Sequence, residues 1–183
     1  MELVENIKHS KVIKNLFVAL LGTVILAVSS KIKIPFYPVP MTMQTLVVLF
    51  IGITFGWKLG VATVTLYLFE GMIGLPVFSG TPEKGLGLIY FTGPTMGYLI
   101  GFIAAVFLAG KFEYSKNFFT NFIKLTFATS FIYIFGIIWL GNLIGWDKPL
   151  IKLGVEPFLL AELLKIIIIT FLIVKLKKIK KYI

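Results

Sequence analysis

Six apolar segments follow one another along this chain of 183 residues, and each approaches the length that crosses a lipid bilayer. A hydrocarbon core about 30 Å thick needs roughly 20 apolar residues in a helix. Because the core offers no water to pair with exposed backbone groups, such segments fold as helices. The segments cover residues 12–29, 41–56, 59–78, 93–109, 118–140 and 158–174. The sequence therefore predicts an all-α membrane protein with six transmembrane helices, in a single domain over residues 1–183.

The composition excludes several functional classes. Hydrophobic residues make up 58% of the chain, more than a soluble domain of this size can cover. The chain has no cysteine, and its single histidine, His9, precedes the first apolar segment among lysines, where it is expected to be solvated. We therefore expect no metal site and no cofactor. The net charge of +10 comes entirely from lysine, without arginine, so nucleic acid is not an expected partner.

The lysines predict how the chain is oriented. With six spans, both chain ends share one side with the connections at 57–58 and 111–117, and twelve of the 18 lysines lie there, against five on the other side. The positive-inside rule then places both termini in the cytoplasm. The lysine-rich tail at 175–181 is expected to meet anionic membrane lipids, with a binding role as the alternative.

The connections on the opposite side are longer and rich in proline, glycine and aromatic residues. They cover residues 31–40, 79–92 and 142–157. Long ordered loops between helices commonly carry function. Because the three loops meet over one end of the bundle, we expect these extracytoplasmic loops to cap a ligand pocket.

Two charges lie within the last apolar segment. Glu162 and Lys165 are three residues apart, so their side chains project from the same helix face. An ionisable group at membrane depth costs several kcal/mol unless it finds a partner in the protein interior. The pair is either a ligand site, with Lys165 for a carboxylate and Glu162 for N–H donors, or a structural ion pair between helices.

Further polar residues lie near the same end of the bundle. Thr42 and Gln44 open the second segment, where they either cap a helix or point toward the suspected pocket. Glu70 lies near the outer end of the third segment, where an interfacial position is favoured and no role is assigned. No glycine-rich phosphate loop is present, and a Ser-His-Asp set lacks its membrane histidine, so the chain is not expected to be an enzyme.

Small residues recur at a spacing of four in the first segment, at Ala19, Thr23 and Ala27. Such a stripe permits close approach of two helices. It serves either internal packing, which the sequence favours, or the docking of a second membrane protein.

Four motifs, in order along the chain, resemble the BioY family of biotin transporters. They are IPFYPVPMTMQT at 34–45, GMIGLPVF at 71–78, GPTMGYLIGF at 93–102, and GVEPF at 154–158 followed by Glu162 and Lys165. Met96 stands where the family pattern has glycine. The resemblance implies a substrate-binding S component of an energy-coupling factor transporter, located in the cytoplasmic membrane of a prokaryote.

The resemblance also implies partners and site residues. It implies biotin as ligand, with a T subunit and two ABC-type ATPases as partners. Lys165 would pair with the valerate carboxylate of biotin, and Glu162, in place of the family's aspartate, would accept from the ureido ring. The matched motifs add Thr42, Gln44, Tyr98 and Phe158 to the expected ligand-binding residues. The small-residue stripe resembles the face that docks the T subunit.

Three other functions are weighed against biotin uptake. The chain could be an S component for another vitamin, or a membrane-embedded partner protein with no ligand. A membrane enzyme acting on lipid or isoprenoid substrates, with Glu162 as general base, is the third. It would require further polar residues around Glu162, and the sequence offers few.

Overall fold

The computed structural model describes residues 2–179, with side chains from residue 11 onward. The side chain of His9 and the tail lysines Lys180 and Lys181 lie outside the described part. The elements are α1 (Glu2–Lys31), β1 (Lys33–Ile34), β2 (Met41–Thr42), α2 (Gln44–Met72), α3 (Leu88–Phe91), α4 (Met96–Lys111), α5 (Phe118–Ile144), α6 (Leu150–Gly154), the 3-10 turn η1 (Glu156–Phe158) and α7 (Leu159–Ile179).

The helices confirm an all-α membrane protein, apart from one short hairpin. Within residues 2–179, four stretches are long and apolar enough to cross a membrane, and α4 is a shorter apolar helix. The four are Lys11–Lys31, Gln44–Met72, Phe118–Ile144 and Leu150–Ile179. The exception to the helical prediction is the antiparallel pair β1–β2, in which Lys33 lies opposite Thr42 and Ile34 opposite Met41.

Helix α2 is folded back on itself at Gly56. This glycine has φ 75° and ψ 173°, a backbone conformation that side chains with a Cβ rarely adopt. In a straight helix, the 23 residue steps from Gln44 to Tyr67 would span about 35 Å. Here the Gln44 side chain donates a hydrogen bond to the Tyr67 hydroxyl at 2.7 Å. The break falls between the second and third apolar segments of the sequence, so each segment forms its own arm of a helical hairpin.

The third helical segment ends earlier than its apolar character suggests. The apolar run continues to residue 78, but the helix ends at Met72. Gly74 adopts a positive φ of 101°, and Pro76 has no backbone N–H to continue the ladder. Residues 73–87 therefore form a loop with α3 beyond it, and apolar composition alone did not predict this.

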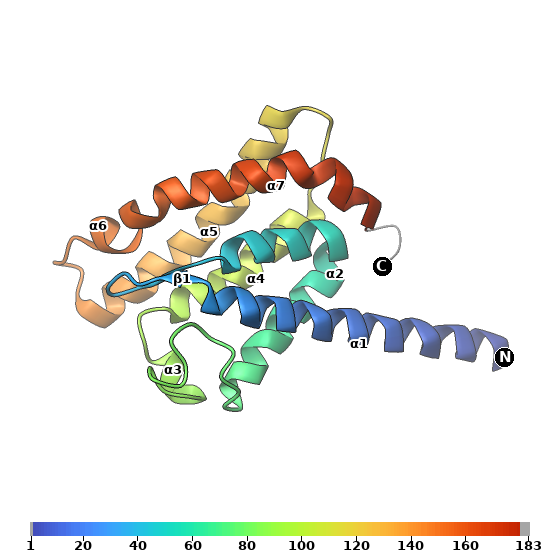
Figure 1. The fold of residues 1–183 in the computed structure, drawn as a ribbon, viewed down its shortest axis with the longest axis horizontal. Coiled ribbons are helices and arrows are strands. Elements are labelled where there is room, and N and C mark those ends of the chain that lie inside the picture. Colours follow the sequence, from blue (N-terminus) through green and yellow to red (C-terminus); the bar gives the residue numbers. More distant parts are fainter. Residues whose placement is uncertain (1, 180–183) are drawn as a thin grey trace.

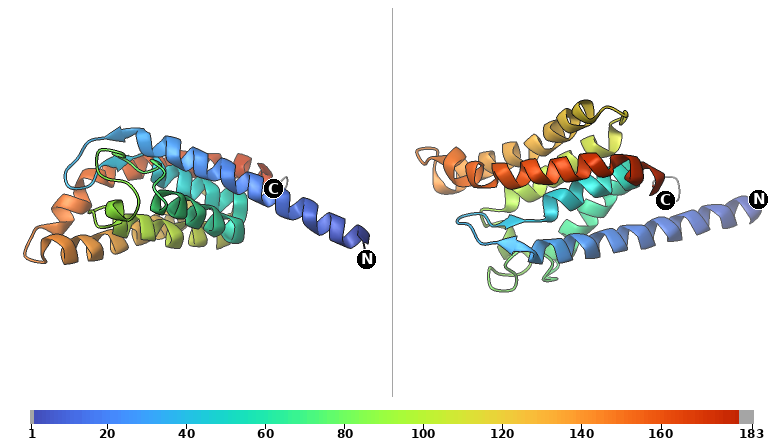
Figure 2. Two further views of the ribbon diagram at one scale, coloured as in Figure 1. Left: turned by 90° about the horizontal axis from the view of Figure 1, so that it is seen from below. Right: turned by 45° about the horizontal axis from the view of Figure 1, so that its top comes forward.

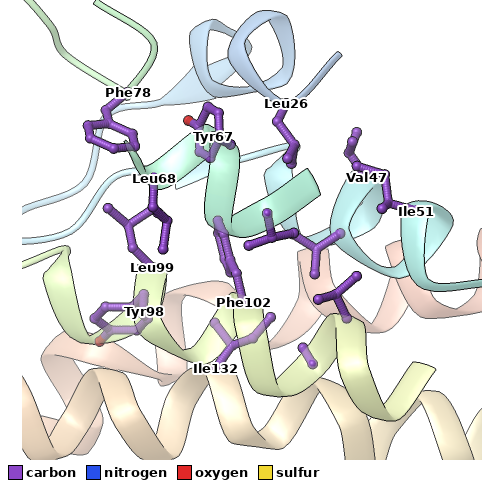
Figure 3. Packing of buried hydrophobic residues seen from close by; sticks show 14 of the residues in the cluster. Leu26, Val47, Ile51, Tyr67, Leu68, Phe78, Tyr98, Leu99, Phe102 and Ile132 are labelled. Carbon is purple, nitrogen blue, oxygen red and sulfur yellow. The ribbon is translucent and has the colours of Figure 1, made fainter. Parts of the chain in front are cut away.

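One apolar core joins the helices. Figure 3 shows Leu26 of α1 and Tyr67 and Leu68 of α2 packed in the same cluster as Tyr98, Leu99 and Phe102 of α4 and Ile132 of α5. The outer faces of α1, α5 and α7 expose large apolar side chains such as Phe17, Ile134 and Phe171. Exposed apolar faces on long apolar helices are suited to contact with lipid.

The connections gather at one end of the bundle. The β1–β2 hairpin, α3 and α6 lie at one end, and the start of α1 and the end of α7 lie toward the other (Figures 1 and 2). The three longer loops predicted from the sequence therefore share one end of the structure.

Candidate ligand-binding pocket

A pocket lies under the gathered connections. Its cavity volume is about 50 Å³, smaller than the roughly 300–1,000 Å³ typical of small-molecule sites. Its wall comes from β2 and the start of α2, from the 79–90 segment, from α4 and α5, and from η1 and α7. The polar lining residues are Thr42, Gln44, Thr45, Ser79, Tyr90, Thr95, Tyr98, Tyr133 and Glu162.

The charged pair of α7 is buried beside this pocket. Glu162 and Lys165 are each 5% exposed, and Lys165 Nζ donates to Glu162 Oε1 at 2.6 Å. The same ammonium donates to the Thr42 carbonyl at 2.6 Å and to Thr45 Oγ1 at 3.0 Å. Thr45 Oγ1 in turn donates to Glu162 Oε1 at 2.8 Å. The three N–H groups of the ammonium are therefore all in use.

Glu162 and Lys165 differ in their access to the pocket. Glu162 lines it, whereas Lys165 lies behind the wall formed by Thr42 and Thr45. The i,i+3 spacing correctly placed both charges on one helix face. It did not show that the lysine would be satisfied by neighbouring protein groups. A ligand carboxylate can reach Lys165 only by taking the place of one of its three acceptors.

Two buried polar atoms among the described residues have no hydrogen-bond partner, and both belong to side chains that line this pocket. They are Oε2 of Glu162, whose carboxylate also interacts with the nearby Tyr133 hydroxyl, and Oγ of Ser79. An unpaired buried polar atom costs about 1–3 kcal/mol, and more for a charged group. A ligand that hydrogen-bonds to both would remove that cost. Since a carboxylate oxygen only accepts, the group facing Glu162 must be a donor such as N–H.

Ser79 is held over the pocket by α3. The Tyr90 hydroxyl donates to the Ser79 carbonyl at 2.8 Å. Burial raises the pKa of Tyr90 above its usual value, so the hydroxyl keeps the proton it donates. The Ser79 side chain is 3% exposed, and its hydroxyl is left for another partner.

Gln44 and Thr42 line the pocket and also bond locally. Gln44 donates to Tyr67 through its amide nitrogen, while its amide oxygen accepts from Thr42 Oγ1 at 3.2 Å. The residue that caps α2 is Met43, whose side chain makes no capping bond. The backbone N–H of Gln44 reaches Thr42 Oγ1 at 3.4 Å. Thr42 therefore bonds the start of α2, and both residues also line the pocket.

Aromatic side chains form an apolar wall. Phe158 contacts Phe36 and Tyr133 with ring centroids 6.1 and 6.2 Å apart, and Tyr98 meets Tyr133 at 6.0 Å. The Tyr98 hydroxyl donates to the Gly154 carbonyl at 2.9 Å. Gly136 makes room for Tyr98, because a Cβ there would overlap its ring. The wall is suited to a flat, partly apolar ring system.

The small-residue stripe faces inward. Ala19 is 6% and Thr23 2% exposed, and Ala27 packs against the core. Thr23 Oγ1 donates to Glu70 Oε1 at 2.9 Å, which joins α1 to the second arm of α2. Glu70 thus has a partner that the sequence did not reveal. This burial agrees with internal packing, and docking of a partner through the stripe stays a prediction.

Several lining residues escaped sequence reasoning. Ser79, Tyr90, Thr45 and Tyr133 were not singled out, although all line the pocket. Ser79 and Tyr90 lie in a segment without periodic pattern, so nothing local marks them. Thr45 lies one residue beyond Gln44 in the matched motif, and its place beside Glu162 depends on the packing of α2 against α7.

The pocket can bind a small molecule, but the residues that line it do not form a recognisable catalytic site. The pocket lining offers an acceptor at Glu162, a hydroxyl at Ser79 and several aromatic rings. A ligand that matches the lining would carry a hydrogen-bond donor for Glu162.

Comparison with known proteins identifies the family. Residues 4–182 match the sequence model of the BioY family. The chain is 35% identical over 150 residues to the probable biotin transporter BioY of Pyrococcus horikoshii, covering 82% of this chain and 85% of that protein. It is 33% identical over 159 residues to the biotin transporter BioY of Thermotoga maritima, covering 86% and 92%. A crystal structure of the S-component for biotin from an ECF-type ABC transporter matches with a TM-score of 0.74 and 28% identity, covering 92% of this chain and 93% of that chain. The chain therefore belongs to the BioY family.

Proposed function

We propose that this protein is the biotin-binding S component of an ECF-type transporter and serves vitamin uptake. Relatives that align over most of the chain are named biotin transporters, and the matching crystal structure is an S-component for biotin. The protein is accordingly a transport subunit and not an enzyme. The observation that carries the proposal is the buried, unpaired Oε2 of Glu162 in an aromatic-walled pocket.

Biotin carries hydrogen-bonding groups that the unpaired atoms of this pocket could use. Its ureido ring carries two N–H donors and a carbonyl acceptor. One N–H would donate to Oε2 of Glu162, and the ureido group would supply a partner for Ser79 Oγ. Tyr98 and Phe158 would pack against the fused rings, with Thr42 and Gln44 at the pocket edge. The two ureido contacts would give partners to the two buried atoms that have none, Glu162 Oε2 and Ser79 Oγ.

Lys165 is the proposed partner of the valerate carboxylate. Its ammonium uses three protein acceptors without ligand, so the carboxylate would replace one of them. The Thr42 carbonyl is the natural one to yield, because a carboxylate is the stronger acceptor for an ammonium. Glu162 would remain paired with Lys165 and keep its position.

The proposed topology has six spans in one domain over residues 1–183. The two arms of α2 count separately, joined at Gly56, and α1, α4, α5 and α7 supply the other four. The gathered connections would lie outside the cell and both termini inside, as the lysine distribution favours. The protein would then reside in the cytoplasmic membrane of a prokaryote, with its pocket open to the outer face.

The proposed partners are a T subunit, two ABC-type ATPases and the surrounding lipids. The exposed apolar side chains of α1, α5 and α7 are available to lipid or to a membrane subunit. If Ala19, Thr23 and Ala27 dock the T subunit, α1 must first separate from its neighbours, because Ala19 and Thr23 are buried and Ala27 is partly buried.

Biotin titration of the purified protein in detergent tests the proposal. We expect saturable binding and a rise in the thermal midpoint, since a ligand at 100 times its Kd stabilises the folded state by about 2.7 kcal/mol. Competition with other vitamins against labelled biotin separates biotin from a different vitamin. No binding and no stabilisation by any vitamin would instead support a membrane partner without a ligand.

A further inference from the structure

The loop that carries Ser79 is fastened to α1 by one lysine. Lys31, the last residue of α1, donates to the carbonyl of Phe78 at 2.9 Å and to the carbonyl of Thr81 at 3.2 Å. It also donates to Thr81 Oγ1 at 3.0 Å. The three N–H groups of its ammonium are thus all directed to residues 78–81, which bracket Ser79.

The same loop is held at its start by other bonds. The carbonyl of Val77 accepts from Ser30 Oγ at 2.7 Å and from the Tyr67 hydroxyl at 2.9 Å. Tyr67 in turn accepts from Gln44, a pocket residue. The end of α1 is therefore linked through hydrogen bonds to two parts of the pocket wall. Ser30 and Tyr67 fix Val77, whereas Lys31 fixes the segment beyond it.

The loop has no regular secondary structure of its own at Ser79. Thr81 Oγ1 donates to the Phe78 carbonyl at 2.8 Å, which closes a small turn around Ser79 and Gly80. Lys31 binds both ends of this turn. Without the lysine, the segment would keep its internal bonds, among them Lys84 N–H to the Gly80 carbonyl at 2.8 Å, the bond from Tyr90 to Ser79 and the buried ring of Phe78. Few bonds to the remaining structure leave such a segment free to open locally.

We propose that Lys31 is a positioning residue: it holds Ser79 over the pocket and thereby slows the release of bound ligand. This inference rests on the proposed function, because Ser79 is its route to the ligand. Lys31 itself does not line the pocket. Its effect is expected in the dissociation rate, because the contact that Ser79 makes with the ligand must break before the ligand leaves.

The test is the dissociation rate of labelled biotin from the purified, preloaded protein. Lys31→Met removes the three bonds and keeps most of the side-chain length. Because the lysine is exposed, the expected acceleration is moderate, roughly three- to tenfold, as for the loss of about one hydrogen bond's net free energy. Lys33→Met is the matched control. It removes the same charge two residues along, from a side chain that makes no hydrogen bond to residues 78–81.

A second variant separates positioning from general damage. In a Ser79→Ala background, Lys31→Met should have less than half its effect on log koff, because the contact it positions is gone. Equal acceleration in both backgrounds would overturn the proposal, as would equal rates in Lys31→Met and Lys33→Met. If the unaltered protein binds no biotin, the proposed function fails instead. Lys31→Arg, which retains the charge and donors, should recover much of the slow release.

Discussion

Lys165 and Glu162 share only one oxygen of the carboxylate: Nζ lies 2.6 Å from Oε1, while Oε2 is buried without a hydrogen-bond partner. The pair is thus both a structural ion pair and part of a pocket. Oε1 joins α7 to Thr45 of α2, and Oε2 is the atom that the proposed ligand would contact. The ion pair uses one oxygen of the carboxylate, and the proposed ligand contact would use the other.

Substitutions of Lys165 and Glu162 should have coupled effects on the stability of the protein. Lys165→Met leaves Glu162 charged, buried and without its cation, which is expected to cost about 3–5 kcal/mol. Thermal unfolding in detergent should show a clearly lowered midpoint for this variant. Adding Glu162→Gln should restore part of the loss, because no unpaired charge then remains. Lys148→Met, which removes one half of an exposed ion pair with Asp147, should change the midpoint little. A double variant less stable than Lys165→Met would contradict the coupling.

The contact of Lys165 with a ligand carboxylate can be tested with a neutral ligand. The unaltered protein should bind biotin more tightly than biotinamide, because only biotin offers an anion to the ammonium. Lys165→Met should lose much affinity for biotin and most of this preference. Isothermal titration with both ligands measures the difference. If affinity for biotin falls by less than about threefold, roughly 0.7 kcal/mol, the lysine does not bind the carboxylate.

Ser79→Ala should separate stability from binding. The Ser79 hydroxyl is buried and unpaired in the ligand-free protein, so its removal should leave the thermal midpoint unchanged or slightly raised. Biotin affinity should fall by roughly three- to tenfold, the value of one hydrogen bond. Ser130→Ala is the control, because that hydroxyl bonds the Phe127 carbonyl of its own helix. A loss of stability without a loss of affinity would show that Ser79 is a structural residue.

Gly136→Ala should disturb the aromatic wall. The added methyl group overlaps the ring of Tyr98, and such overpacking costs about 1–3 kcal/mol. Both the thermal midpoint and the affinity for biotin should fall. Ile138→Ala, on the exposed face of the same helix, should leave binding unchanged.

A second substitution identifies the cause of that loss. In a Tyr98→Ala background the ring is absent, so Gly136→Ala should cause little additional loss of stability. If Gly136→Ala lowers the stability as much in this background, the added methyl group clashes with a residue other than Tyr98.

The sequence by itself determined the membrane class, the apolar segments, the loops that gather at one end and the charged pair on one helix face. These follow from composition, segment length and helical spacing, which are local properties of the chain. Two expectations, for the small-residue stripe and for Glu70, could be decided only from the tertiary structure. The stripe at Ala19 and Thr23 is covered by α2, and Glu70 is bonded to Thr23. Neither partner is near in sequence.

Only the tertiary structure decided which polar atoms are satisfied. Gly56 folds α2 back, which brings Gln44 to Tyr67, and the packing of α2 on α7 supplies Thr42 and Thr45 to Lys165. Ser79 reaches the pocket because Lys31 and Tyr90 hold its loop. Hydrogen bonding depends on distances of about 3 Å between atoms that are remote along the chain. For that reason the sequence revealed which groups are costly to bury, and the fold alone revealed which of them still lack a partner.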